Sequence, residues 1–282
     1  MRVLVTGAGG QLGHDVVAVC EAAGDEVTAA DRAALDVGDR DQVFQAITAL
    51  RPDAVLHVGA WTAVDACESD PDRAYRVNAL GTRWVADASR QVGAYLSYVS
   101  TDYVFDGTKA DPYVEWDAVN PQSVYGRSKL GGEDEVRAHC PGASVVRTSW
   151  VCGEHGHNMV KTVLSLADRP SLAFVDDQRG CPTFTADLAV ALRRLAASRL
   201  AGTFHVTNQG SLSWYEFVRA ILELSGNDSS IVRPITTAEL DPPRPAPRPA
   251  NSVLDNAALR LAGLPLLPDH RESLAKLLSR LP

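Results

Sequence analysis

Two side chains four positions apart could together move a proton: Tyr125 and Lys129, in the run YGRSK at 125–129. On a helix this spacing puts the phenol and the ammonium on one face. A phenol with a pKa near 10 is a poor proton shuttle at neutral pH unless a nearby cation favours the phenolate. Lys129 could supply that cation and bind a ribose, while Tyr125 protonates the oxygen of a carbonyl that receives a hydride. A surface pair without chemistry is the alternative.

A second group of polar side chains, STDYVFDG at 100–107, directly follows an apolar run. Ligands of parallel sheets bind beyond the carboxyl ends of the strands, so these hydroxyls would emerge beside a bound cofactor. Thr101 could donate a hydrogen bond to a substrate carbonyl and help to tune Tyr125. A turn that merely caps the strand is the other interpretation, and in isolation the more ordinary one.

The glycine-rich run GAGGQLG at 7–13 follows the first apolar segment and opens a helix-like stretch. Glycines such as Gly7, Gly10 and Gly13 let the backbone turn sharply and approach a pyrophosphate, which a helix N-terminus at Gln11 and Leu12 would bind. A purely structural turn is the alternative, but the placement between strand and helix favours dinucleotide binding.

The acidic residue expected of NAD-binding proteins is Asp31, which stands 18 positions after Gly13 at the end of the second apolar run. Such a carboxylate accepts hydrogen bonds from the adenosine ribose. Arg32 follows at once and could turn toward a 2'-phosphate. The cofactor is therefore expected to be NADH or NADPH, and a solvated strand end is the interpretation without function.

Alternation of short apolar runs with amphipathic stretches predicts the elements that position these residues. Strands are expected at 3–5, 27–30, 55–58, 95–100 and 145–147. Helices are expected at 11–23, 41–50, 72–91 and 125–139. Repeated strand–helix–strand units predict an α/β fold, a Rossmann-like doubly wound parallel sheet.

After residue 150 the pattern loosens, with helices expected at 159–167, 185–197 and 213–224 and a strand at 202–206. We assign 1–150 to a dinucleotide-binding domain and 151–282 mainly to a smaller, partly interleaved substrate-binding domain, whose later segments return to the sheet. The proline-rich run 241–249 is either a stiff surface connector or a segment along a ligand cleft.

Composition excludes several classes of protein. A net charge of -8 argues against a broad nucleic-acid interface, which needs clustered Lys and Arg. No apolar run is long enough for a membrane span and no signal peptide is visible, so the expected compartment is the cytoplasm. Five scattered cysteines without a C-x-x-C pair predict reduced thiols and neither a disulfide framework nor a zinc site.

These motifs together resemble the extended short-chain dehydrogenase/reductase family, the NAD-dependent epimerase/dehydratase-like proteins, and within it the dTDP-4-dehydrorhamnose reductases. The resemblance spans nearly the whole chain. It rests on GAGGQLG at 7–13, AWTAVD at 60–65, STDYVFDG at 100–107, YGRSKLGGE at 125–133, RTSWV at 147–151, DDQRGCPT at 176–183 and RPANS at 248–252.

The resemblance implies a role for several further residues. The cofactor would be surrounded by Gly10, Gln11, Leu12, Asp31, Asp36, Val37, Ala60, Trp61 and Thr62. The catalytic trio would be Thr101, Tyr125 and Lys129, and Thr101, Asp102 and Trp150 would touch the substrate. We add the hypothesis that Arg248 pairs with a diphosphate oxygen of a nucleotide sugar.

The implied activity is the NAD(P)H-dependent reduction of the 4-keto group of dTDP-4-dehydro-6-deoxy-L-mannose to dTDP-L-rhamnose. The alternatives are a 4-ketoreductase of another nucleotide deoxysugar and a non-catalytic dinucleotide-binding subunit. The chain departs from the family pattern at Gly59, Gly131, Cys152 and Cys181.

Relatives that dimerise around Mg²⁺ carry acidic residues at the places of Asp15 and Asp187. Because the sequence ends without an acidic tail, we assign no metal and leave a homodimer open.

Overall fold

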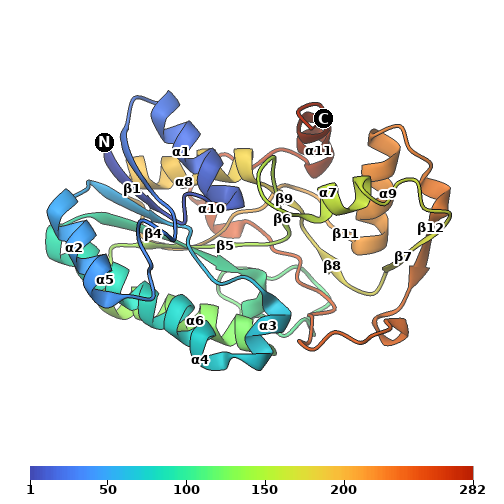
Figure 1. The fold of residues 1–282 in the computed structure, drawn as a ribbon, viewed down its shortest axis with the longest axis horizontal. Helices are drawn as coiled ribbons and strands as arrows, with labels where there is room; N and C mark the ends of the chain where they lie inside the picture. Colours follow the sequence, from blue (N-terminus) through green and yellow to red (C-terminus); the bar gives the residue numbers. More distant parts are fainter. Residues whose placement is uncertain (282) are drawn as a thin grey trace.

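A six-stranded parallel sheet forms the centre of the larger of two lobes in the computed structural model, which describes residues 1–281 (Figure 1). In spatial order its strands are β2 (Glu26–Ala30), β1 (Arg2–Thr6), β3 (Ala54–His57), β4 (Tyr95–Thr101), β5 (Ser144–Thr148) and β10 (Gly202–His205). Every neighbouring pair is parallel. The near-continuous apolar runs predicted this arrangement, because such strands are buried on both faces.

Helices cover both faces of the sheet (Figure 1). One face packs against α1 (Gln11–Ala22), α8 (Thr185–Ala197) and the short α10 (Ala257–Leu261). The other packs against α2 (Arg40–Leu50), α5 (Gly81–Val92) and α6 (Val124–His139). The predicted doubly wound α/β fold is therefore confirmed.

The chain changes direction across the sheet between β1 and β3. From β1 it runs outward to β2, then returns to the other side of β1 to form β3, β4 and β5. Where the strand order reverses in this way, the loops part and leave a crevice beyond the carboxyl ends of the strands. This crevice is the place where the fold positions a ligand.

The single helix expected at 72–91 is wrong in detail. The segment divides into α4 (Pro71–Tyr75), a π-helical turn (Arg76–Leu80) and α5, preceded by α3 (Val64–Ser69). In the π turn the buried side chain of Asn78 is hydrogen-bonded to the backbone of Trp61, on the neighbouring loop. Periodicity could not reveal the turn because one extra residue barely disturbs the apolar pattern.

The smaller lobe has its own core and three two-stranded sheets. The pairs are β6 (Val151–Cys152) with β9 (Thr183–Phe184), β7 (Leu172–Val175) with β12 (Val232–Ile235), and β8 (Arg179–Gly180) with β11 (Leu212–Ser213). Its helices are α7 (Met159–Leu164), α9 (Trp214–Leu224) and α11 (His270–Leu278). Single turns of 3-10 helix lie at Asp102–Val104, Ser229–Ile231 and Thr237–Glu239.

Residues after 150 contribute to both lobes, since β10 pairs with β5 and α8 packs on α1. The division of roles at residue 150 remains a prediction. The proline-rich run reaches α3, where the Ala246 N–H donates to the Asp65 carboxylate at 3.1 Å. Over residues 1–281, we find no helix with the length and apolarity that crossing a membrane requires.

Candidate active site

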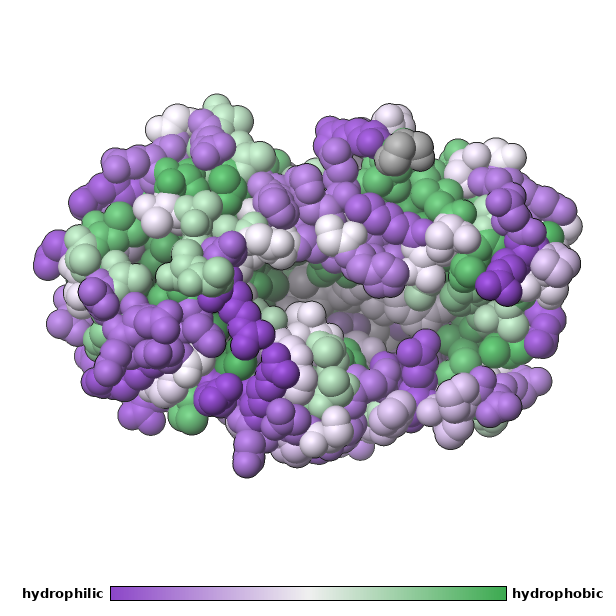
Figure 2. Space-filling view, viewed as in Figure 1, coloured by the Kyte–Doolittle hydropathy of each residue, from purple (hydrophilic) through white to green (hydrophobic). Residues whose placement is uncertain are grey.

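A cavity of about 790 Å³ opens between the lobes, beyond the carboxyl ends of the central strands (Figure 2). All but one of the predicted site residues line it: Gly7, Gly10, Gln11, Leu12, Gly13, Asp31, Asp36, Val37, Ala60, Trp61, Thr62, Thr101, Asp102, Tyr125, Lys129 and Trp150. The exception is Arg248.

The glycine run forms the floor of one end of the cavity. Gly7 has φ 70°, a left-handed backbone that favours glycine. A Cβ on Gly13 would overlap the backbone of Gly7 and Ala8, so the turn depends on that glycine too. Helix α1 begins after Gly10 without a side-chain cap and without an acidic residue in its first turn. Its first N–H groups can therefore bind an anion such as phosphate.

The outer rim of this end carries Asp31, Arg32 and Asp36. Oδ1 of Asp31 accepts hydrogen bonds from the backbone N–H groups of Ala33 and Ala34, both at 2.9 Å. The Arg32 side chain is 71% exposed and lies 4.0 Å from Asp36. Asp31 thus caps its own turn, and the exposed Arg32 side chain lies at the same rim.

A loop after β3 forms one wall of the cavity and holds Ala60, Trp61 and Thr62. The Asn78 side chain accepts from the Trp61 N–H at 2.8 Å and donates to the Trp61 carbonyl at 3.1 Å. The Arg73 guanidinium lies 4.4 Å from the centre of the Trp61 ring. The sequence did not point to Asn78 or Arg73, because neither belongs to a motif with its own chemistry.

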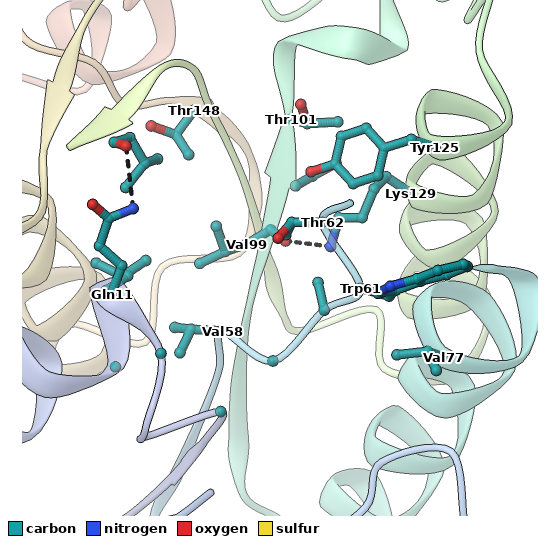
Figure 3. Close-up of a pocket in the computed structure, with 18 of the residues that line it drawn as sticks. Gln11, Val58, Trp61, Thr62, Val77, Val99, Thr101, Tyr125, Lys129 and Thr148 are labelled. Atoms are coloured by element: carbon teal, nitrogen blue, oxygen red, sulfur yellow. Dashed lines mark hydrogen bonds between the residues drawn. The ribbon is translucent and has the colours of Figure 1, made fainter. Parts of the chain in front are cut away.

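Thr101, Tyr125 and Lys129 meet at the inner end of the cavity (Figure 3). Ser123 caps α6 by accepting from the Gly126 N–H at 3.1 Å, which starts the helix one residue before the tyrosine. Tyr125 and Lys129 then project from one helix face toward the end of β4, where Thr101 stands. The Lys129 ammonium donates to the Val99 carbonyl at 2.7 Å.

Burial dominates the electrostatics of this trio. It raises the pKa of Tyr125 well above its ordinary value, and a hydrogen bond with Thr101 opposes that rise. Burial lowers the pKa of Lys129 to about 7. The expected stabilisation of the phenolate by Lys129 is not among the main causes of this shift, which burial dominates. A protonated phenol suits a group that must donate a proton.

Asp102 has a carboxylate oxygen without a partner. The residue is 2% exposed, and its Oδ1 accepts a hydrogen bond from the Thr101 hydroxyl at 3.0 Å. Its Oδ2 is buried and unpaired, and burial raises the pKa of this carboxyl to about 6. A buried polar atom of this kind normally has a partner, so a ligand hydroxyl could supply one here.

Two stacked indoles close the side of the cavity toward the smaller lobe. Trp150 follows β5 with φ 47°, and its ring lies 3.5 Å from that of Trp214, with an angle of 6° between the planes. Gly180 packs so closely against Trp150 that a Cβ there would overlap the indole. Sequence reasoning missed Trp214, which reads as an ordinary core residue at the start of an amphipathic helix.

Arg248 lies apart from the cavity lining. Its guanidinium pairs with both carboxylate oxygens of Asp65, at 2.5 and 2.8 Å, and donates to the Ala246 carbonyl. The pair joins the proline-rich run to α3, beside the wall that holds Trp61. The role in binding a diphosphate remains a prediction.

Asp15 and Asp187 line a second cavity, of about 240 Å³, between the lobes. Asp187 already accepts hydrogen bonds from Asn208 and Ser273. Among residues 1–281 no three His, Cys, Asp or Glu side chains are grouped as metal ligands would be.

The whole chain is similar to proteins of one family. The RmlD substrate binding domain family matches residues 1–282. A dTDP-4-dehydrorhamnose reductase of Streptomyces griseus is 43% identical over 282 residues, covering 98% of this chain and 92% of that protein. The spore coat polysaccharide biosynthesis protein SpsK of Bacillus subtilis is 42% identical, covering 98% of this chain and 96% of that protein.

A solved structure extends the similarity to three dimensions. The dTDP-4-dehydrorhamnose reductase of Bacillus anthracis, in complex with NADP, is 39% identical and superposes with a TM-score of 0.94, covering 98% of each chain. The similarity therefore covers both lobes and the cavity between them.

Proposed function

We propose an activity for this chain, which belongs to the RmlD substrate binding domain family. It reduces the 4-keto group of dTDP-4-dehydro-6-deoxy-L-mannose to dTDP-L-rhamnose with NADPH or NADH. One observation carries the proposal beyond family membership. Thr101, Tyr125 and Lys129 line the same cavity as the glycine turn at the start of α1. A keto group and a dinucleotide could thus meet there.

The residues at the outer end fit a dinucleotide. The uncapped N-terminus of α1 and the close backbone approach at Gly7 and Gly13 provide a cradle for a pyrophosphate. Asp31 would bind the adenosine ribose, and Arg32 would reach a 2'-phosphate. Lys129 would hold the nicotinamide ribose. When bound, the cofactor supplies the hydride.

The chain itself supplies the proton. Tyr125 would donate its phenolic proton to the 4-oxygen as negative charge builds there, and Thr101 would donate a hydrogen bond to the same oxygen. Asp102 would bind a neighbouring sugar hydroxyl through its unpaired Oδ2. Each group is held by the end of β4 or by α6, so the proton donor and the hydrogen-bond donor keep a fixed relative geometry.

The partner is a small nucleotide-sugar molecule, for which Trp150 would form a flat wall. The remaining expectations belong to this proposal: action in the cytoplasm, and no bound nucleic acid, membrane or required Mg²⁺. Whether the chain forms a homodimer is left open. Reduction of another nucleotide-linked keto sugar would use the same groups.

Incubation of the protein with dTDP-4-dehydro-6-deoxy-L-mannose and NADPH or NADH tests the proposal. We expect loss of the reduced-cofactor absorbance and formation of dTDP-L-rhamnose, identified by NMR. A product with the opposite configuration at C4 would assign the chain to another pathway. Tight cofactor binding without turnover of any keto sugar would instead support a non-catalytic subunit.

A further inference from the structure

A buried ion pair lies one helical turn beyond Lys129, outside the groups used in the reaction above. Glu133 follows Lys129 by four residues on α6 and is 0% exposed. Its buried partner Arg147, on β5, is 3% exposed and binds both carboxylate oxygens, at 2.9 and 2.8 Å. The exposed Arg137 of α6 also donates to Oε2, at 2.7 Å. Burying two charges costs more than most proteins recover in stability, so such a pair often has another task.

The pair connects the elements that carry the catalytic groups. Glu133 stands on the same face of α6 as Tyr125 and Lys129, because the three are spaced by four residues. Oε1 of Glu133 also accepts a hydrogen bond from the Ser100 hydroxyl at 2.7 Å. Ser100 immediately precedes Thr101 on β4 and lies opposite Arg147 on β5. One carboxylate thus fixes α6 against both strands.

Glu133 also determines the charge around Lys129. The Lys129 ammonium, 2% exposed, faces the Tyr98 ring of β4 at 4.1 Å and Tyr125 on its own helix. Burial and, after it, the nearby Lys129 ammonium lower the pKa of His57 of β3. Of the nearby carboxylates, Glu133 is the one whose negative charge favours the ammonium form of Lys129. Without Glu133, the Arg147 guanidinium would be a second buried cation near Lys129 with no carboxylate to balance its charge.

We propose that Glu133 is a positioning residue for the reduction: it sets the register of α6 against β4 and favours the ammonium form of Lys129. The inference rests on the proposed function. The ion pair fixes the positions of the Tyr125 phenol and the Lys129 ammonium on α6 relative to the Thr101 hydroxyl on β4. The negative charge of Glu133 offsets part of the free energy that the Lys129 ammonium loses because it is buried away from water.

The test compares Glu133→Gln and Glu133→Asp with the control Glu135→Gln. Glu135 lies on the same helix, in a surface pair with His139. For Glu133→Gln we expect kcat at pH 8 to fall by about 10-fold or more, since lowering the pKa of Lys129 by one unit leaves about a tenth as much ammonium at that pH. Both kcat and NADPH affinity should fall at high pH as Lys129 loses its proton. In Glu133→Gln this alkaline limb should move to lower pH by about one unit or more. Glu133→Asp keeps the charge and should keep the limb.

The two readouts separate the possible failures. NADPH affinity against pH is measured without sugar, so it tests Glu133 even if another keto sugar is the true substrate. An alkaline limb that stays in place in Glu133→Gln overturns the proposal. If that variant does not fold, Ser100→Ala tests the register alone. It should lower kcat by about 3- to 10-fold, the effect of one hydrogen bond, at unchanged cofactor affinity. An unchanged kcat would overturn it.

Discussion

The two ends of the cavity are built differently. At the outer end, backbone N–H groups of the glycine turn and the solvent-exposed side chains of Asp31 and Arg32 face the ligand space. At the inner end the side chains themselves are enclosed, with Lys129 2% and Tyr125 8% exposed. Water can replace a lost contact at the outer end but not at the inner end, so equal chemical changes should have unequal effects.

Tyr125→Phe should give the largest effect. It removes the proton donor and keeps the ring, so kcat should fall by about 10²- to 10⁴-fold, the usual contribution of general acid catalysis. Cofactor affinity, measured by fluorescence titration, should stay normal. Tyr75→Phe is the matched control because Tyr75 is 40% exposed on α4. Wild-type kcat in Tyr125→Phe would remove this residue from the mechanism.

Lys129→Met should lower kcat by about 10²- to 10³-fold, as expected for a lost electrostatic contact in an enclosed site. Unlike the tyrosine variant, it should also weaken cofactor binding, because the ammonium has both tasks. Titration with NADPH in the absence of sugar measures the second effect. Unchanged affinity would leave Lys129 with the electrostatic role alone.

The buried ammonium should also make stability depend on pH. Burial lowers the pKa of Lys129 from 10.5 to about 7. Between these values the unfolded chain holds a proton that the folded chain has lost, so the free energy of unfolding rises with pH. The slope for one proton is about 1.4 kcal/mol per pH unit. Urea unfolding of wild type and Lys129→Met, compared from pH 7 to 10, isolates this pH dependence. Well below pH 7 the folded and the unfolded chain both hold the proton, so Lys129 should add no slope there.

The Asp65–Arg248 pair lies between the two extremes, half buried beside the cavity wall. We expect Arg248→Ala to lower kcat/KM for the sugar nucleotide by about 10- to 100-fold, the effect of a charge-assisted bond, with normal cofactor binding. Asp65→Asn should reproduce the loss if the pair acts by holding the proline-rich run. If Asp65→Asn is harmless while Arg248→Ala is not, Arg248 binds the diphosphate directly.

Asp31→Ala should give the smallest effect, at the outer end. Loss of an exposed hydrogen bond should raise the KM for NADH by about 2- to 10-fold. The KM for NADPH should change less, because removing a carboxylate also relieves repulsion of the 2'-phosphate. Steady-state kinetics with both cofactors measure the ratio. Equal changes would mean that Asp31 only caps its turn.

The sequence predicted the larger lobe well because its signals are local. Five of the six central strands are short, mainly apolar runs between turns, and α1 and α6 follow Gly10 and Ser123. Part of the cavity lining could be predicted for the same reason, since Asp31 and Thr101 follow strands and the carboxyl ends of parallel strands meet at one edge. Other lining residues, such as Trp61 and Trp150, were predicted only from the resemblance to a known family. The helix at 185–197 even matches α8 at both ends.

The smaller lobe could not be predicted in the same way. Strands β6, β8, β9 and β11 have two residues each and pair with distant segments, so they have no detectable period. Trp214 and Asn78 became visible only through contacts with Trp150 and Trp61. Arg248 shows the converse difficulty, since a motif can identify a residue without revealing that another side chain already binds it.

The late position of α8 and β10 in the chain affects how the protein can fold during synthesis. Leu188 and Leu192 of α8 and Phe204 of β10 share a core with Val3 and Val5 of β1. A nascent chain ending near residue 150 would therefore expose an apolar sheet face and the unpaired edge of β5. Such surfaces are the usual targets of chaperones and of aggregation. The ribosome must release some 55 further residues beyond that point, up to His205, before α8 and β10 can cover this face, and α10 with Leu259 follows later still.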